Sequence, residues 1–251
     1  MQRQHRLSPT RPRCSSDEAR VKKTVTDQAD GLRRLMLSSP GRLVSVVGSD
    51  PVSVASVTSN LAAALVQQGK EVLLLDEHDG AQAVQVDREQ RLVLINAVLD
   101  KEGSLSRLAA QADNIVVVLR ANAASIKESY ACIKRLHYAH ALQRLHVLVN
   151  GVADAVEAQR ILANLVHTGN RYLGLAVESA GWVRADPLFA QAQRLNLTVV
   201  EAFQASPAAT DFRQIASNLL EWPLLAAGGR PPSRPPGTIA SQNANSRMEM
   251  R

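Results

Sequence analysis

Residues 43–65 read LVSVVGSDPVSVASVTSNLAAAL. A short run rich in valine leads into a polar turn with glycine and proline. A longer segment follows, in which apolar residues recur at helical spacing. This order is typical of the first strand–turn–helix unit of an α/β sheet. Further apolar runs follow along the chain, and most of them are separated by one segment of helical character.

The whole pattern predicts an α/β fold: a doubly wound, mainly parallel sheet with helices on both faces. The aromatic share of only 3%, with Val, Leu, Ile and Ala supplying most apolar residues, suits strands that are buried on both faces. The expected strands are 43–47, 72–75, 92–95, 115–119, 145–149 and 173–177, with a weaker one near 197–200. The expected helices are 54–67, 105–112, 126–138, 153–167, 187–194 and 207–220. The polar stretch between Asp76 and Leu92 is too short for a full helix and a further strand.

The net charge of +6 belongs to the two ends of the chain. Residues 1–24 carry seven basic and two acidic side chains, and residues 225–251 carry four and one, which leaves 25–224 at −2. Both ends lack apolar periodicity. The sequence therefore predicts a disordered basic tail at 1–25, an α/β domain at 41–224 and a disordered Pro-rich tail at 225–251. The folded part is not expected to bind DNA directly.

Composition excludes several classes of protein. No apolar run reaches the ~18 residues that a membrane span needs, and the last tail has no apolar stripe for an amphipathic membrane anchor. The two cysteines, Cys14 and Cys132, are too few for a disulfide scaffold or a zinc site. A cytoplasmic location is the expectation.

A short amphipathic helix is expected at 26–38, just before the first strand. The segment TDQADGLRRL places Ala29, Leu32 and Leu35 on one face, with Asp27 in the first turn and Arg33 towards the end. Such a helix either packs on its own domain or binds a partner. The residues alone leave both possibilities open.

Ligands of a doubly wound sheet gather at the carboxyl ends of its strands. The turn after residues 43–47 has one glycine, Gly48, and no lysine, and Pro51 removes a backbone donor, so a working phosphate loop is not indicated. Asp76 could hold a metal-bound water or cap a turn, and Asn150 could be a binding residue or a turn former. The sequence predicts no catalytic residue and no metal ligand set.

Several segments carry a resemblance to a known family. DQADGLRRL is similar to the DQAxxLR helix that precedes the ATPase domain in the flagellar FlhG/FleN branch of the MinD/ParA family of deviant-Walker ATPases. Three later segments are also similar to parts of that family: NLAAALVQQGKEVLLLD, VLVNGVADAVEAQRI and the segment that starts at VRADPLFAQAQRL. The resemblance covers about 26–222, and it implies a P-loop NTPase-like fold of the ParA/MinD type.

The resemblance also implies where a nucleotide site would lie, and there the chain departs from the family. Val54 stands where the family has its Walker lysine, and Ala55 where it has the Mg²⁺-binding threonine. Ser49 stands at the position of the signature lysine, and Asn96 at that of the Walker-B aspartate. Gly48, Asp76 and Asn150 retain the family's residue types as a vestigial nucleotide site. This degenerate P-loop implies a pseudo-ATPase, with neither ATP nor Mg²⁺ expected as a cofactor.

The resemblance further implies a regulator of flagellum biogenesis and motility, acting on flagellar number and placement. In that branch the DQA helix looks like the activator of FlhF, an SRP-type GTPase. The partner residues implied for FlhF are Asp27, Gln28, Ala29, Leu32, Arg33 and Leu35. A flagellar transcription activator is a second implied partner. The protein is expected to be a monomer or a nucleotide-independent dimer, recruited to the cell pole by a partner and without a stable membrane anchor.

Two alternatives stay beside this hypothesis. One is an active MinD/ParA-type ATPase with an atypical nucleotide site around Asp76 and Asn150. The other is a relative of the DNA-partitioning or cellulose-synthesis proteins that acts as a binding module. The DQA helix favours the flagellar hypothesis over the last, because those branches lack it.

Overall fold

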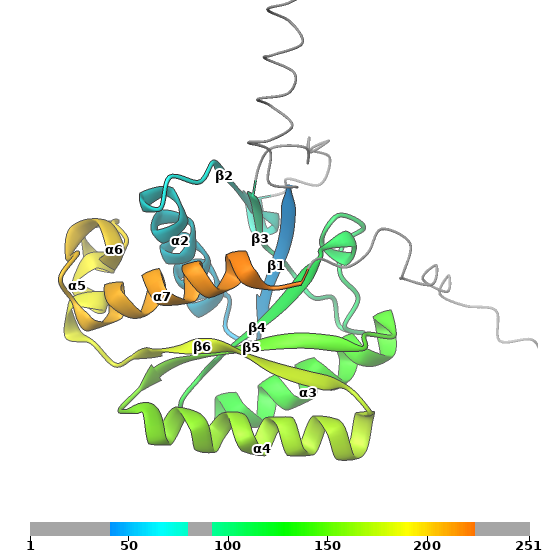
Figure 1. Ribbon diagram of the computed structural model, residues 1–251. Helices are drawn as coiled ribbons and strands as arrows, with labels where there is room; N and C mark the ends of the chain where they lie inside the picture. The colour runs from blue at the N-terminus through cyan, green and yellow to red at the C-terminus, as the bar shows by residue number, and fades with distance from the viewer. Residues whose placement is uncertain (1–40, 80–91, 224–251) are drawn as a thin grey trace, which may run out of the picture. The chain divides into compact units, whose positions relative to one another are not determined.

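Six parallel strands form one sheet in the computed structural model, which describes residues 41–79 and 92–223 (Figure 1). Their order across the sheet is β2-β3-β1-β4-β5-β6, and every neighbouring pair is parallel. The strands are β1 (Arg42–Gly48), β2 (Val72–Asp76), β3 (Leu92–Asn96), β4 (Asn114–Arg120), β5 (Arg144–Val152) and β6 (Ala176–Arg184). The predicted α/β class and parallel sheet are confirmed. Both tails and the helix expected at 26–38 lie outside the described residues.

Helices cover both faces of the sheet, as predicted. One face packs against α2 (Pro51–Gln67), α5 (Pro187–Arg194), α6 (Val199–Ala202) and α7 (Pro207–Glu221). The other face packs against α3 (Ala123–His140) and α4 (Ala155–Leu173). Figure 1 shows the two helix layers on either side of the strands. Each face has its own core, because alternate residues of a strand point to opposite sides of the sheet.

Three sequence-based expectations about elements were wrong. The segment 105–112 forms only a 3-10 turn at Ala109–Gln111, where the hydroxyl of Ser45 donates to the carbonyl of Ala109 at 2.9 Å. The strand expected at 173–177 begins later, because Gly174 ends α4 in the left-handed conformation. The weak strand near 197–200 is instead the start of α6, which a capping box between Thr198 and Glu201 initiates.

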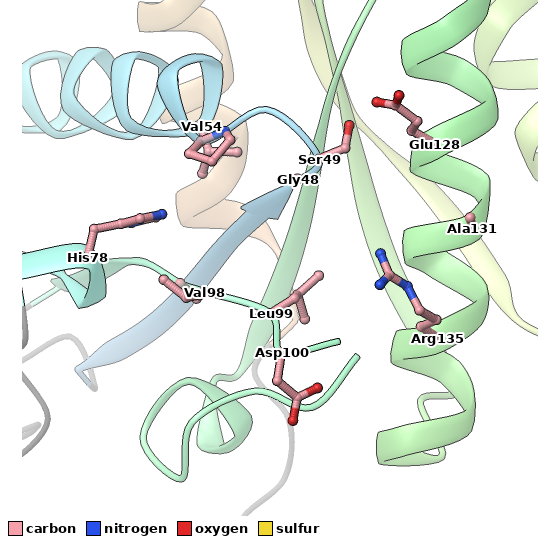
Figure 2. A pocket seen from close by; sticks show the side chains of 12 residues that line it. Gly48, Ser49, Val54, His78, Val98, Leu99, Asp100, Glu128, Ala131 and Arg135 are labelled. Carbon is pink, nitrogen blue, oxygen red and sulfur yellow. The ribbon is translucent and has the colours of Figure 1, made fainter. Parts of the chain in front are cut away.

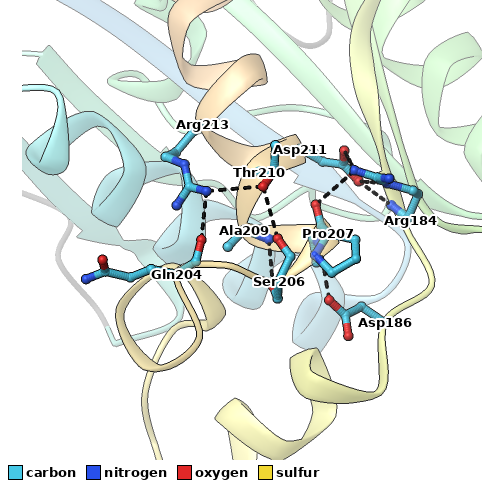
Figure 3. Close-up of polar contacts among 10 residues, drawn as sticks. Arg184, Asp186, Gln204, Ser206, Pro207, Ala209, Thr210, Asp211 and Arg213 are labelled. Atoms are coloured by element: carbon cyan, nitrogen blue, oxygen red, sulfur yellow. Dashed lines mark hydrogen bonds and ion pairs between the residues drawn. The ribbon is translucent and has the colours of Figure 1, made fainter.

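Hydrogen bonds at the end of β6 position the closing helices (Figure 3). The carboxylate of Asp186 accepts from the backbone N–H of Leu188 in α5 and from that of Ala208 in α7, at 2.9 and 3.2 Å. Arg184, the last residue of β6, donates through Nε and Nη2 to the carboxylate of Asp211 at 2.9 and 2.8 Å. The carboxyl edge of the sheet is thereby tied to the first turn of α7.

A buried polar cluster ties the other end of α7 to the amino edge of the sheet. The guanidinium of Arg42 donates to the carbonyl of Leu219 and, at 2.6 Å, to that of Trp222. The indole of Trp222 stacks on the ring of His146 in β5, with centroids 3.8 Å apart. The last carbonyls of a helix lack the usual partners within the helix, and Arg42 supplies them with donors from the sheet.

Candidate functional site

A cavity of about 450 Å³ opens at the carboxyl edge of the sheet (Figure 2), and we call it the carboxyl-edge groove. Four segments meet there: the turn between β1 and α2, His78 after β2, the loop after β3, and one face of α3. Its lining residues are Gly48, Ser49, Pro51, Val54, His78, Ala97, Val98, Leu99, Asp100, Glu128, Ala131 and Arg135. No lysine is among them. The volume lies in the range of ordinary ligand pockets.

The turn that leads into α2 is stabilised by the protein's own carboxylate. Asp50 is the N-cap of α2, and its side chain accepts from the backbone N–H of Val52 at 3.2 Å. Pro51, at the first helical position, has no N–H to offer. A helix N-terminus attracts anions through its free N–H groups and its dipole. Here the carboxylate of Asp50 already meets that helix end, and its Oδ2 also lies 3.7 Å from Arg120 Nη1, so the turn is occupied by an ion pair of the protein itself.

Val54 occupies the floor of the groove. Its side chain is 2% exposed and belongs to the core cluster that also contains Val46, Val116 and Val118. A Cβ atom placed on Gly48 would lie 2.7 Å from Val54 Cγ2 and from the carbonyl oxygen of Val118. Gly48 is therefore required for close packing between β1, β4 and α2.

Asp76, the last residue of β2, belongs to a hydrogen-bonded group with Asn96 and His78. The amide of Asn96, its register partner on β3, donates to Asp76 Oδ2 at 3.0 Å. His78 donates its backbone N–H to Asp76 Oδ1 at 2.9 Å, and its Nδ1 lies 3.0 Å from the same oxygen. Burial raises the pKa of Asp76, but hydrogen bonds from His78 and Asn96 outweigh it and hold that pKa below its ordinary value. Asp76 is thus an ionised hydrogen-bond partner that holds the His78 ring in place.

The structure separates the three vestigial positions. Gly48 lines the groove. Asp76 is not a lining residue, but its carboxylate contacts His78, which is one. Asn150 is not among the lining residues; its amide donates to the hydroxyl of Ser53 at 3.4 Å. Asp76 and Asn150 are therefore both hydrogen-bonded to other residues of the protein.

Sequence reasoning missed the wall that α3 contributes. Glu128, Ala131 and Arg135 follow one another at spacings of three and four, so they share one helix face. Figure 2 shows this face turned towards the loop that carries Leu99. The spacing was readable in the sequence, but nothing local indicated that the loop after β3 would lie opposite.

Two further observations apply to residues 41–79 and 92–223 alone. Within them, no three His, Cys, Asp or Glu side chains gather in a way that could bind a metal ion. Within the same residues, no helix is both long enough and apolar enough to span a bilayer.

No protein-family model matches the chain. Among curated proteins, the antiactivator FleN of Pseudomonas aeruginosa is 26% identical over 209 residues, which cover 82% of this chain and 70% of that protein. Among solved structures, the MinD cell division protein of Aquifex aeolicus matches with a TM-score of 0.55 and 14% identity, covering 73% of this chain and 98% of that one. The septum site-determining protein MinD of Pyrococcus horikoshii, solved with Mg-ADP, matches with a TM-score of 0.50 and 12% identity, covering 71% and 95%. The structural matches show a shared fold, and FleN supplies the likeness in sequence.

Proposed function

This chain is a FleN-like protein with the MinD/ParA fold, and from that premise we propose that it regulates flagellum biogenesis without using nucleotide. The observation that carries the proposal is the turn before α2, in a chain otherwise similar to an antiactivator. At this turn the carboxylate of Asp50 caps the helix and Val54 is buried in the core.

The contacts of this turn support the loss of nucleotide chemistry. A hydrogen bond to a charged group contributes about 1.5–3 kcal/mol, so the absent lysines at Ser49 and Val54 would each cost a triphosphate an amount of that order. Ala55 has no hydroxyl for Mg²⁺, and Asn96 brings an amide where a carboxylate would attract the ion. The residues present do not fit Mg-ATP.

The proposed partners follow from the resemblance to the flagellar branch. The helix expected at 26–38 is proposed to bind and stimulate the SRP-type GTPase FlhF, through Asp27, Gln28, Ala29, Leu32, Arg33 and Leu35. The α/β domain is proposed to restrain a flagellar transcription activator, in keeping with the name antiactivator that FleN carries. Both activities require binding surfaces and no hydrolysis by this chain.

A deletion tests the helix. Removing residues 1–37 should leave the melting temperature nearly unchanged and abolish stimulation of FlhF's GTPase, since β1 starts at Arg42 and both cores, among the residues that the structure describes, lie after it. The matched control is Lys22→Ala with Lys23→Ala, which alters the tail but not the helix. If the truncated protein melts early, or if the full chain never changes FlhF turnover, the FlhF part of the proposal is wrong.

A second measurement separates the proposal from an atypical ATPase. Hydrolysis of ATP by the full chain that disappears in Asp76→Ala or Asn150→Ala would favour the active enzyme with a site around those two residues. Absence of turnover, together with binding to a flagellar partner, would support the nucleotide-independent regulator.

A further inference from the structure

One wall of the carboxyl-edge groove is formed by α3, and the other by the loop after β3. On α3, Glu128 and Arg135 flank Ala131, whose short side chain leaves the middle of the wall open. Val98 and Leu99 form the loop wall, and Val54 forms the floor. The groove is therefore apolar along its centre and charged at two points along α3.

Both walls are held in place before anything binds. The backbone N–H of Val98 donates to the carboxylate of Glu77 at 3.0 Å. Asp100 Oδ1 accepts from the backbone N–H of Glu102 and of Ser104, at 2.9 and 2.7 Å, which fixes the rest of the loop. A preformed groove loses little conformational entropy on binding, so more of the contact energy contributes to affinity.

The stem of Arg135 is also fixed. Gly103, with φ of +90°, passes so close to α3 that a Cβ atom there would lie 2.4 Å from Arg135 Cβ. The guanidinium of Arg135 donates only to the carbonyl of Lys101, at 3.4 Å, within the part of the chain that the structure describes. In the same part, the carboxylate of Glu128 has no hydrogen bond or ion pair. The carboxylate of Glu128 and the guanidinium of Arg135 are thus available to a partner, about 10 Å apart along α3.

Exposed apolar side chains border the groove. Val98 is 39% exposed, and Val52, next to Pro51 of the lining, is 73% exposed. Tyr138 is 68% exposed and lies one turn beyond Arg135 on α3. Tyrosine and arginine are enriched among the residues that dominate protein–protein binding energy. Of these three side chains, Val98 belongs to the lining itself, so the groove offers an exposed apolar contact to a partner.

We propose that the carboxyl-edge groove is the docking site for an amphipathic helix of the flagellar transcription activator. Apolar side chains of that helix would enter between Val98 and Ala131. A basic residue would face Glu128, and an acidic residue two turns away would face Arg135, because a partner helix lying along α3 repeats the same seven-residue spacing. The inference rests on the proposed function, since it assigns a surface to the activator that the function requires.

Binding of the purified activator to the full-length protein tests the proposal, with affinity measured by biolayer interferometry. Ala131→Trp, which fills the groove from an exposed helix position, should weaken binding about tenfold or more. Arg135→Glu and Glu128→Lys should each weaken it by a similar factor and flatten its salt dependence. Arg160→Glu makes the same charge change on the exposed side of α4 and should bind like the unaltered protein. Circular dichroism melting should show all four variants folded.

The outcomes separate the surface from the function. If the unaltered protein binds the activator and all the groove variants bind equally well, the docking site is wrong while the proposed function stands. If the unaltered protein does not bind the activator, the proposed function fails and the docking site fails with it. Loss of binding in Ala131→Trp and in both charge variants, but not in Arg160→Glu, supports the proposal.

Discussion

Val54 closes over Gly48 so tightly that a Cβ atom on that glycine would lie 2.7 Å from a methyl group of the valine. The pair joins the first turn of α2 to the end of β1 at the place where the fold would otherwise present a phosphate loop. An apolar contact here stabilises the domain and provides no charge for a ligand.

Replacement of Val54 by lysine should destabilise the domain without creating a nucleotide site. The ammonium group would enter a position that is 2% exposed, and an unpaired buried charge is costly. We expect a loss of about 3 kcal/mol or more, seen as a fall in melting temperature of about 6–12 °C. Val54→Ile is the control and should change the melting temperature much less. A lysine variant that melts like the unaltered protein and binds ATP would contradict this prediction.

Asp50→Ala should weaken the start of α2. The variant loses the hydrogen bond to the N–H of Val52 and the favourable charge at the helix N-terminus. The expected loss is about 1 kcal/mol in the free energy of unfolding, measured by urea denaturation. Ser49→Ala, one residue earlier and outside the cap, should have little effect. Equal stabilities of the two variants would show that Asp50 does not act as a cap.

Acid should destabilise the fold through His146, which stacks on Trp222 and is 2% exposed. Burial, with the charges of Arg144 and Arg42, lowers the pKa of His146 to about 4. The unfolded chain, with an ordinary histidine pKa near 6.5, therefore binds the proton first. The contribution to stability is complete above about pH 6.5, and about 3 kcal/mol is lost as the pH falls to about 4.

Urea denaturation of His146→Phe across this pH range tests the effect. The phenyl ring can keep the stack on Trp222 but does not titrate, so this variant should lose less stability between pH 6.5 and 4 than the unaltered protein. The carboxylate of Glu178, 3.7 Å from His146 Nδ1, is present in both proteins. Parallel pH profiles for His146→Phe and the unaltered protein would refute the prediction.

The oligomeric state should not respond to nucleotide. The resemblance implies that a dimer bridged by ATP would use a signature lysine at position 49, where this chain has Ser49. Sedimentation velocity should give the same species, monomer or dimer, with and without ATP and Mg²⁺. A shift from monomer to dimer that appears only with ATP would overturn this expectation.

Much of the fold was predictable because its strands are apolar runs of the right length between helical segments. The bounds predicted for 187–194 match α5. The segment 197–200 was mistaken for a strand because adjacent β-branched residues favour strands. The T-x-x-E spacing of Thr198 and Glu201 was the stronger signal, since the two residues form a capping box.

The site was less predictable, because its residues come together only through the tertiary fold. Gly48 and His78 could be placed at strand ends from sequence. The position of Arg135 opposite Leu99 depends on how α3 packs on β4 and on the course of the loop after β3, and neither has a local sequence signal. Contacts between distant segments are what pattern reasoning leaves undetermined.

Isothermal titration of ATP with Mg²⁺ into the full-length protein tests the central claim most directly, with a MinD ATPase titrated in the same buffer as the positive control. We expect no saturable heat at micromolar concentrations, because Asp50 caps the helix end and the buried Val54 lines the groove. Saturable binding with micromolar affinity would contradict it.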